Sequence, residues 1–271
     1  MSLHTRPPAL LPAHASFATS GVRWVKHWNE HLFSFAIERP ASFRFRSGEF
    51  VMLGLLDGEK PLMRAYSIAS PAWSDELEFL SIKVPDGPLT SKLQLIRPDD
   101  HLYLGKKPTG TLVADALLPG KRLFMLSTGT GLAPFLSIAR DPDIYERFSQ
   151  VILVHSVRRV SDLAYHDELT AQLASDPLVQ EQALLQFHYI PTVTREPFRT
   201  TGRIGDLAED GTLFKSPVLG DREFNPETDR VMLCGSTAMI RDFAAMLEGR
   251  GFEEGSNAAP GHYVIERAFV G

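Results

Sequence analysis

The sequence is poor in cysteine, in long apolar runs and in excess positive charge. A single cysteine among 271 residues excludes an internal disulfide framework and is too few for a zinc-ribbon or iron–sulfur site. No apolar run reaches the roughly 18 residues that a membrane-spanning helix needs. The net charge of −5 argues against nucleic-acid binding. These absences predict a cytoplasmic protein without a metal site, a membrane anchor or a nucleic-acid partner.

Length and composition predict two globular domains. Domains usually run to about 100–200 residues, so a chain of 271 residues favours two. A hydrophobic content of 44% suffices for full cores without disulfides. Residues 1–118 carry 13 basic and 12 acidic side chains, whereas residues 119–271 carry 15 and 21. The first part could present a basic face to an acidic partner, but charge alone favours chance scatter.

The residue pattern changes near residues 118–121. Between Gly21 and about Gly110, short β-type runs alternate with turn signals, which is typical of an antiparallel barrel or sandwich. After Pro119–Gly120, apolar strands alternate with helices, which predicts a parallel, doubly wound sheet. The predicted fold is therefore an all-β antiparallel barrel followed by an α/β parallel-sheet domain.

The elements of both domains can be placed along the chain. In the first domain we expect strands at 22–28, 32–38, 50–56, 64–70, 77–84 and 101–107, and one helix within 87–96. In the second we expect strands at 122–128, 151–157, 184–193, 230–236 and 262–270, with helices at 132–140, 165–175, 202–209 and 237–251. The Pro-rich start has no long apolar region and is expected to be flexible rather than a signal peptide. The predicted boundaries are a tail at 1–17, an all-β domain at 18–118 and an α/β domain at 119–271.

The stretch "STGTGLAPF", residues 127–135, is the clearest ligand motif. It follows a strand and opens a helix, and Gly129 and Gly131 would let the backbone turn sharply and approach a pyrophosphate. The third position of the dinucleotide-binding fingerprint is Pro134 instead of Gly or Ala. An ordinary strand–helix turn is the alternative, but the strand–turn–helix context favours a nucleotide site.

Basic residues at two strand ends indicate which coenzyme would bind. An acidic residue near the end of the second strand typically holds the ribose of NAD, whereas this chain has Arg158 and Arg159 there. Thr194 and Arg195 follow the next strand in the same way. For each arginine alone, a solvated strand end is an equally good explanation. Two such ends together favour the 2′-phosphate of NADPH, because guanidinium groups pair with phosphate.

Two further features suggest a second nucleotide and a reaction centre. Thr90 and Ser91 begin the helix expected within 87–96, where N–H groups could bind phosphate or a hydroxyl could simply cap the helix. Cys234 ends an apolar strand, at the edge where ligands bind in α/β sheets, although a lone cysteine is usually only a small hydrophobic residue. Two phosphate-type helix starts in one chain suggest a redox relay between two cofactors.

These motifs, in their order, resemble those of one enzyme family. The stretches "RAYSIASP", "IKVPDGPLTSKL", "STGTGLAPFLSI", "HSVR…DLAY", "VTRE", "CGST" and "ERAFV" are similar to those of bacterial ferredoxin/flavodoxin–NADP⁺ reductases. The resemblance extends from about residue 18 to the end of the chain, with every block in order. It implies an FAD-containing enzyme that passes a hydride between NADPH and FAD and then single electrons to a carrier protein.

The resemblance also implies which residues bind FAD. Arg64 would pair with the pyrophosphate, Tyr66 would lie against the isoalloxazine ring, and Ser67 would donate a hydrogen bond near flavin N5. The full set implied for FAD is Arg64, Ala65, Tyr66, Ser67, Lys83, Val84, Leu89, Thr90, Ser91, Thr130, Ala268 and Phe269. Ala268 and Phe269 would cover the flavin and have to move aside before the nicotinamide can stack, so they could gate hydride transfer.

A second set of residues is implied for NADP and for catalysis. The positions implied for NADP are Gly129, Gly131, Arg158, Arg159, Thr194, Arg195 and Cys234. Cys234 would border the nicotinamide, Glu266 would relay a proton, and Ser67 completes the predicted catalytic set.

The expected partners are flavodoxin and ferredoxin. The single cysteine excludes a fused iron–sulfur domain, so the electrons must leave for a separate protein. The basic residues expected near the flavin edge are Arg64, Lys83, Lys92 and Arg97. We expect a monomer. The alternatives are a ferric-siderophore or free-flavin reductase on the same scaffold and, less favoured, a non-enzymatic redox sensor.

The segment "RAYSIAS" poses a geometric question. Strand alternation sends Arg64, Tyr66 and Ile68 to one face and Ala65 and Ser67 to the other, yet Tyr66 and Ser67 are both assigned to the flavin. Either the flavin stands edge-on at the end of the strand, or a bulge near Tyr66 turns one of the side chains. The sequence alone does not choose between them.

Overall fold

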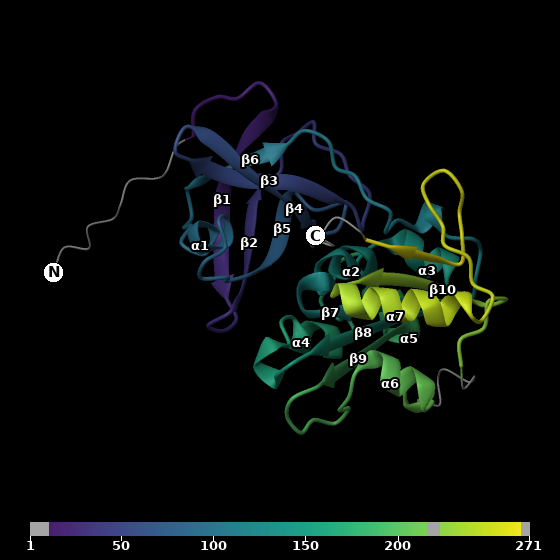
Figure 1. Ribbon diagram of the computed structural model, residues 1–271. Helices are drawn as coiled ribbons and strands as arrows, with labels where there is room; N and C mark the ends of the chain where they lie inside the picture. The colour runs from purple at the N-terminus through teal and green to yellow at the C-terminus, as the bar shows by residue number, and fades with distance from the viewer. Residues whose placement is uncertain (1–10, 216–222, 267–271) are drawn as a thin grey trace.

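Two β-sheets follow one another along the chain in the computed structural model, which describes residues 11–215 and 223–266 (Figure 1). The first sheet is antiparallel, and the second is parallel and flanked by helices. The predicted fold class is therefore confirmed.

The first sheet contains six strands. They are β1 (Phe17–His27), β2 (Leu32–Glu38), β3 (Phe50–Asp57), β4 (Lys60–Ser67), β5 (Glu76–Ile82) and β6 (His101–Gly105), in the order β4-β3-β6-β1-β2-β5. The chain just after β4 reaches β5, because the N–H of Ala69 donates to the carbonyl of Glu78 at 2.8 Å. The two outer strands are thereby brought together as in a barrel. Phe33, Phe35 and Phe79 fill its interior and are inaccessible to solvent.

The second sheet contains five parallel strands with helices on both faces. The strands are β7 (Arg122–Thr128), β8 (Gln150–Val157), β9 (Phe187–Val193), β10 (Asp229–Cys234) and β11 (Tyr263–Ile265), in the order β11-β10-β7-β8-β9. The helices are α2 (Leu132–Ala139), α3 (Pro142–Arg147), α4 (His166–Thr170), α5 (Gln180–Gln186), α6 (Ile204–Glu209) and α7 (Thr237–Glu248). Separate apolar clusters cover the two faces, which explains why the strands are apolar along their whole length.

Short helical turns connect these elements. The one-turn helix α1 spans Thr90–Leu93, and the 3₁₀ turns are η1 (Ala114–Ala116), η2 (Gly129–Gly131), η3 (Val160–Asp162) and η4 (Thr212–Phe214). Among the described residues, no helix has the length and apolarity needed to cross a membrane. The same part of the chain contains no group of three or more His, Cys, Asp or Glu that could hold a metal ion.

Two predicted helices are shorter than expected, and one strand begins later. The helix expected at 165–175 ends as α4 at Thr170, because Gln172 and Leu173 have positive φ angles of 50° and 55°. The helix expected within 87–96 is only α1, followed by turns in which Leu95 and Ile96 bond three residues back. The strand expected at 184–193 begins at Phe187, because α5 occupies the preceding residues.

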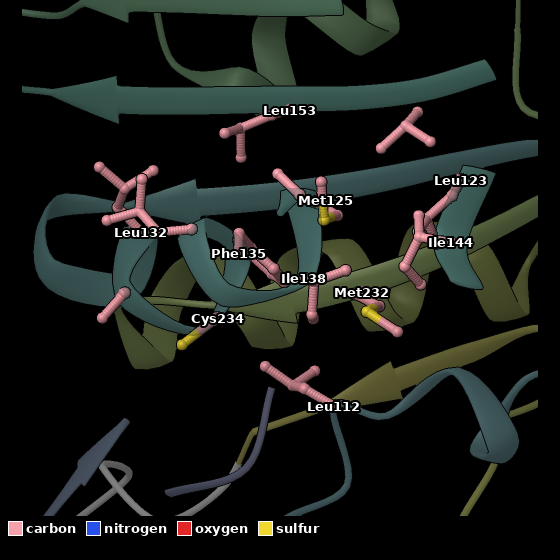
Figure 2. Close-up of a cluster of buried hydrophobic side chains, with 14 of the residues drawn as sticks. Leu112, Leu123, Met125, Leu132, Phe135, Ile138, Ile144, Leu153, Met232 and Cys234 are labelled. Carbon is pink, nitrogen blue, oxygen red and sulfur yellow. The ribbon is translucent and has the colours of Figure 1, made fainter. Parts of the chain in front are cut away.

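Helix α2 lies between the two sheets (Figure 1). Every residue from Leu132 to Ala139 is buried. Figure 2 shows Leu132, Phe135 and Ile138 of this helix among side chains of the parallel sheet, with Leu112 on the other side of the helix. Leu32, Ala69 and Leu80 of the antiparallel part belong to the same apolar cluster. The contact between the two halves is thus a continuous apolar core.

Candidate active site

The ends of β7 and β10 are held together by backbone contacts that only glycine permits. A Cβ atom at Gly131 would overlap the carbonyl group of Cys234, and one at Gly235 would overlap the hydroxyl of Thr128. The N–H of Ser236 donates to that Thr128 hydroxyl at 2.8 Å. The fold itself therefore requires glycine at position 131, because its missing side chain lets the glycine loop pack against the strand that ends at Cys234.

Gly129 has a different environment. Its φ is +55°, it is exposed, and a Cβ atom there would meet no atom within 4 Å. The turn η2 that it begins leads directly into α2, whose N-terminus carries no side-chain cap and no acidic residue in its first turn. Uncapped N–H groups at a helix start attract anions. The loop thus suits the predicted pyrophosphate, with Thr130 half-buried between the two glycines.

A buried histidine contacts the backbone of this loop. Nε2 of His155 lies 3.2 Å from the carbonyl oxygen of Gly129, and Nδ1 lies 3.3 Å from the hydroxyl oxygen of Tyr189. Burial lowers the pKa of His155 to about 4, so the ring is neutral at pH 7. Because a carbonyl only accepts, Nε2–H donates to Gly129, and Nδ1 accepts from Tyr189. Sequence reasoning missed His155, although a titratable residue inside the apolar run "VILVHSV" was a usable signal.

We expect replacement of His155 by glutamine to flatten the acid dependence of stability. The folded-state pKa of about 4 lies below the unfolded value of 6.5, so the stabilisation is present above pH 6.5 and is lost as the pH falls toward 4. Between pH 7 and pH 5 the wild type should lose about 2 kcal/mol more unfolding free energy than His155→Gln. Urea denaturation at both pH values measures this difference. The exposed His31, changed to glutamine, is the matched control, and equal losses in wild type and His155→Gln would contradict the expectation.

The basic residues predicted for the 2′-phosphate lie at the ends of adjacent strands. The N–H of Arg195 donates to the carbonyl of Arg158 at 3.0 Å, so these two exposed arginines are neighbours across β8 and β9. The N–H and hydroxyl of Thr194 both bond the carbonyl of Val157, at 3.0 Å and 3.2 Å. Arg159 is also exposed and leads into η3. The structure thus brings Arg158, Thr194 and Arg195 together.

Two further arginines, which sequence reasoning missed, lie in the loop that follows β9. The loop turns back on the strand, because Gly202 donates to the carbonyl of Val193 at 3.1 Å. Arg199 and Arg203 lie on this returning segment, and both are exposed. The signal that could have found Arg203 is the tripeptide "GRI" at the start of a predicted helix, where Arg203 is the N-cap of α6.

Of the four FAD residues predicted on β4, Tyr66 and Ser67 are buried at the end of the strand. Ser67 pairs with Phe50 and Tyr66 pairs with Val51, in a β3–β4 ladder whose register is continuous. The bulge offered as one explanation for "RAYSIAS" is therefore absent from this ladder, and the strand simply ends at Ser67. The hydroxyl oxygen of Tyr66 lies 3.3 Å from that of Ser81.

The environment of Ser67 fits a bound flavin. Its side chain is 6% exposed, and its hydroxyl has no hydrogen-bond partner in the part of the chain that the structure describes. A buried hydroxyl without a partner is costly, so a polar ligand atom at this place would compensate it. The guanidinium of Arg64 is exposed and bonds only its neighbouring carbonyl, that of Met63, among the contacts described. Ala65 is half-buried between them.

The remaining FAD residues differ in how freely they can bind a ligand. Leu89 is buried in the barrel core, Val84 is exposed, and the Thr90 hydroxyl donates to the carbonyl of Val84 at 3.3 Å. The N–H of Ser91 is already donated to Gly87, which leaves its hydroxyl for a phosphate. The ammonium group of Lys83 donates to the carbonyl of Asn29 at 2.9 Å.

The predicted catalytic residues Cys234 and Glu266 lie at neighbouring strand ends. The N–H of Glu266 donates to the carbonyl of Leu233 at 3.1 Å. Burial, and then the carboxylate of Glu266, raise the pKa of the Cys234 thiol, so that it stays protonated. A cavity of about 450 Å³ is lined by Glu266 together with Gly110 and Phe50, the strand partner of Ser67.

Residues from both sheets line this cavity. Phe50, the strand partner of Ser67, comes from the antiparallel sheet, and Glu266, whose carboxylate raises the pKa of Cys234, follows the last strand of the parallel one. The predicted flavin-covering residues Ala268 and Phe269 lie outside the described residues.

Comparisons with known families assign a cofactor class to each sheet. Residues 25–113 match the oxidoreductase FAD-binding domain, and residues 125–245 match the oxidoreductase NAD-binding domain. These matches put the FAD-type sequence on the antiparallel sheet and the NAD-type sequence on the parallel sheet.

Individual relatives match along almost the whole chain. A flavodoxin/ferredoxin–NADP reductase of Rhodobacter capsulatus is 53% identical, covering 97% of this chain and 96% of the relative. A ferredoxin–NADP reductase of Pseudomonas aeruginosa is 52% identical, covering 93% of this chain and 97% of the relative. The crystal structure of a Neisseria gonorrhoeae ferredoxin NADP⁺ reductase with bound FAD and NADP superposes with a TM-score of 0.84 at 33% identity, covering 93% of this chain and 99% of that one.

Proposed function

The chain belongs to the ferredoxin–NADP reductase family, and from this premise we propose how its residues divide the work of the reaction. It is an NADPH-dependent, FAD-containing oxidoreductase that reduces ferredoxin or flavodoxin. The observation that supports the residue assignment is the cavity where Glu266 lies with Phe50, the strand partner of Ser67, while the carboxylate of Glu266 acts on the thiol of Cys234.

The antiparallel sheet holds FAD. Arg64 would pair with the pyrophosphate, and the hydroxyl of Ser91 would add a donor at the start of α1. Tyr66 would lie against the ring system, and the hydroxyl of Ser67, which has no partner among the described residues, would donate to the ring at N5. The cofactor, when bound, accepts two electrons as a hydride and releases them one at a time.

The parallel sheet holds NADPH. The N–H groups from Gly129 to the start of α2 bind the pyrophosphate, and Arg158 and Arg195 form a pair for the 2′-phosphate. Arg199 and Arg203 belong to the same basic end of the sheet. This arrangement supports NADPH over NADH. NADH carries a hydroxyl where NADPH carries the 2′-phosphate, so several guanidinium groups would have no anion to bind.

The three predicted catalytic residues have different tasks at the nicotinamide. Cys234 offers a small, protonated thiol beside the nicotinamide, because burial and the carboxylate of Glu266 raise its pKa. Glu266, beside the cavity, exchanges a proton with solvent as electrons leave. Ser67 fixes the position of the acceptor atom by its hydrogen bond.

The docking surface for the carrier is smaller than the sequence suggested. Lys92 forms an ion pair with Asp57, and Lys83 is held by Asn29, so neither offers a fully free charge. Arg64 and Arg97 are exposed, and no ion pair to either is described. Because Arg64 is proposed to pair with the FAD pyrophosphate, we infer that Arg97 steers an acidic carrier to the antiparallel sheet.

Reduction of the carrier should therefore depend on salt. Exposed charges mainly steer encounter, so the second-order rate of ferredoxin or flavodoxin reduction should fall several-fold between low and high ionic strength. Arg97→Gln should lower the low-salt rate about threefold. Arg241→Gln, on α7 of the parallel sheet, is the matched control and should change nothing. A rate that is independent of salt would refute the docking assignment.

Stopped-flow kinetics test the proposed function as a whole. The desalted protein should be yellow, NADPH should bleach the flavin faster than NADH, and ferredoxin and flavodoxin should reoxidise it in parallel experiments. A colourless protein would favour a reductase that uses flavin as a diffusing substrate, and failure of NADPH to bleach the flavin would favour a redox sensor. The domain boundaries, the monomeric state and the cytoplasmic location stay predictions.

A further inference from the structure

Tyr165 has a backbone conformation that bulky residues rarely adopt. Its φ and ψ angles are 59° and 15°, in the left-handed region, at the start of α4. Such a conformation is costly for a residue with a Cβ atom and persists only where its surroundings enforce it. The side chain is 6% exposed and crosses from the parallel sheet to the antiparallel one.

The Tyr165 hydroxyl joins a chain of hydrogen bonds on the antiparallel sheet. It lies 2.6 Å from the hydroxyl oxygen of Ser34 on β2 and 2.6 Å from Oε1 of Glu78 on β5. The indole N–H of Trp28 donates to Ser34 at 2.9 Å. Since a carboxylate only accepts, the Tyr165 hydroxyl donates to Glu78, and the Ser34 hydroxyl donates to the Tyr165 oxygen. The donors of Trp28, Ser34 and Tyr165 thereby each have an acceptor.

Glu78 also reaches the far end of α2. Its Oε2 lies 3.5 Å from Nη1 of Arg140, the C-cap of that helix. The indole N–H of Trp73 donates to the Arg140 carbonyl at 3.0 Å. Helix α2 begins at the glycine loop proposed for NADPH, so the antiparallel sheet holds the same rigid element that presents this loop.

The backbone of Glu78 also forms hydrogen bonds with the segment that follows Ser67. Its carbonyl accepts from Ala69, two residues after Ser67, and its N–H donates to the hydroxyl of Ser70 at 3.1 Å. One residue thus contacts the segment that follows Ser67, the end of α2, and Tyr165. No other residue described in these contacts joins all three.

The surroundings of this network are apolar. Leu32, Leu80 and Ala69 pack into the core cluster of α2, and the ring of Trp28 lies 4.7 Å from that of Tyr165. An apolar interface alone could slide with little change in energy, whereas buried polar groups are satisfied at one relative position only. The hydrogen bonds therefore select a single placement of the two sheets.

We propose that Ser34, Glu78, Arg140 and Tyr165 form an intersheet clamp that sets the position of the glycine loop relative to Ser67, and so the distance over which hydride passes. These are positioning residues, since none lies among the residues proposed to touch either cofactor. The inference rests on the proposed function, because it presupposes hydride transfer between the two sheets. Small misplacements of reacting atoms lower rates steeply.

Tyr165→Phe tests the intersheet clamp, because it removes one oxygen and keeps the ring. In the flavin-loaded enzyme, the single-turnover rate of flavin reduction by saturating NADPH should fall about fivefold. Reoxidation of dithionite-reduced enzyme by flavodoxin, which does not require NADPH, should stay at the wild-type rate. Ser34→Ala should lower the rate of flavin reduction by the same factor. The double variant Tyr165→Phe/Ser34→Ala should be no slower than either single variant.

Tyr145→Phe is the matched control. Its hydroxyl donates to the carbonyl of Ala139 at 2.6 Å, near the same end of α2, but both partners lie on the parallel side. This variant should lower thermal stability and leave the hydride-transfer rate unchanged. Wild-type hydride transfer in both Tyr165→Phe and Ser34→Ala would overturn the proposal, as would equal slowing by Tyr145→Phe. An absence of NADPH-driven flavin reduction in the wild type would instead overturn the proposed function.

Discussion

Ser67→Ala is expected to slow the reduction of bound FAD by NADPH about 100-fold, a loss typical of removing one preorganised donor from a reaction centre. The side chain is 6% exposed, and its hydroxyl finds no partner among the described residues, so a bound flavin is the group it can serve. Without the hydroxyl, the acceptor atom loses a hydrogen bond and part of its fixed orientation. Single-turnover stopped-flow absorbance of the flavin measures the effect directly.

The control for this experiment is another buried serine. The hydroxyl of Ser137 on α2 is also buried without a described partner, and Ser137→Ala should keep the wild-type rate. FAD content is measured in each variant, so that weak cofactor binding is not mistaken for slow chemistry. A Ser67→Ala enzyme that is fully loaded and as fast as the wild type would show that the hydroxyl does not act on the flavin.

Arg195→Ala is expected to raise the KM for NADPH roughly 30-fold while leaving the KM for NADH nearly unchanged. A hydrogen-bonded charge pair contributes about 1.5–3 kcal/mol, which corresponds to a factor of about 10 to 150. Arg195 is exposed and bonds through its backbone to Arg158, so its removal should leave the strand ladder intact. Steady-state kinetics with both coenzymes, using ferricyanide as electron acceptor, give the two values.

A second arginine controls for the loss of charge. Arg147 lies on α3 and pairs with Asp115, so Arg147→Ala should affect neither coenzyme. Arg158→Ala should behave like Arg195→Ala, because the two are neighbours. If Arg195→Ala raised the KM values for NADPH and NADH equally, the 2′-phosphate would have to be bound elsewhere.

Much of the fold was readable because the hydrophobic pattern differs between the two halves. Short β-type runs with turn signals between them predicted the antiparallel sheet, and near-continuous apolar strands alternating with helices predicted the parallel one. The errors fell where local pattern and chain geometry disagree. Residues 165–175 look helical throughout, but the left-handed backbone at Gln172 and Leu173 ends the helix, and sequence periodicity carries no sign of φ.

The candidate site was predictable in part for a similar reason. Gly129, Arg158 and Arg195 follow strands in sequence, and the ends of parallel strands always meet at one edge of the sheet. The apolar run around His155 was a signal for a buried titratable group, but it gives no indication of the carbonyl and hydroxyl that the ring contacts. Its partners, Gly129 and Tyr189, are 26 and 34 residues away along the chain.

The sequence by itself determined the two kinds of sheet, the glycine loop, the paired arginines and the resemblance to a reductase family, because each depends on residues close together in the chain. Only the tertiary structure decided how the halves meet. Glu266 lines a cavity together with Phe50, the strand partner of Ser67, and Tyr165 reaches Ser34 and Glu78 across separations of 131 and 87 residues. Such contacts depend on how two folded sheets pack, and no local pattern of residues encodes that packing.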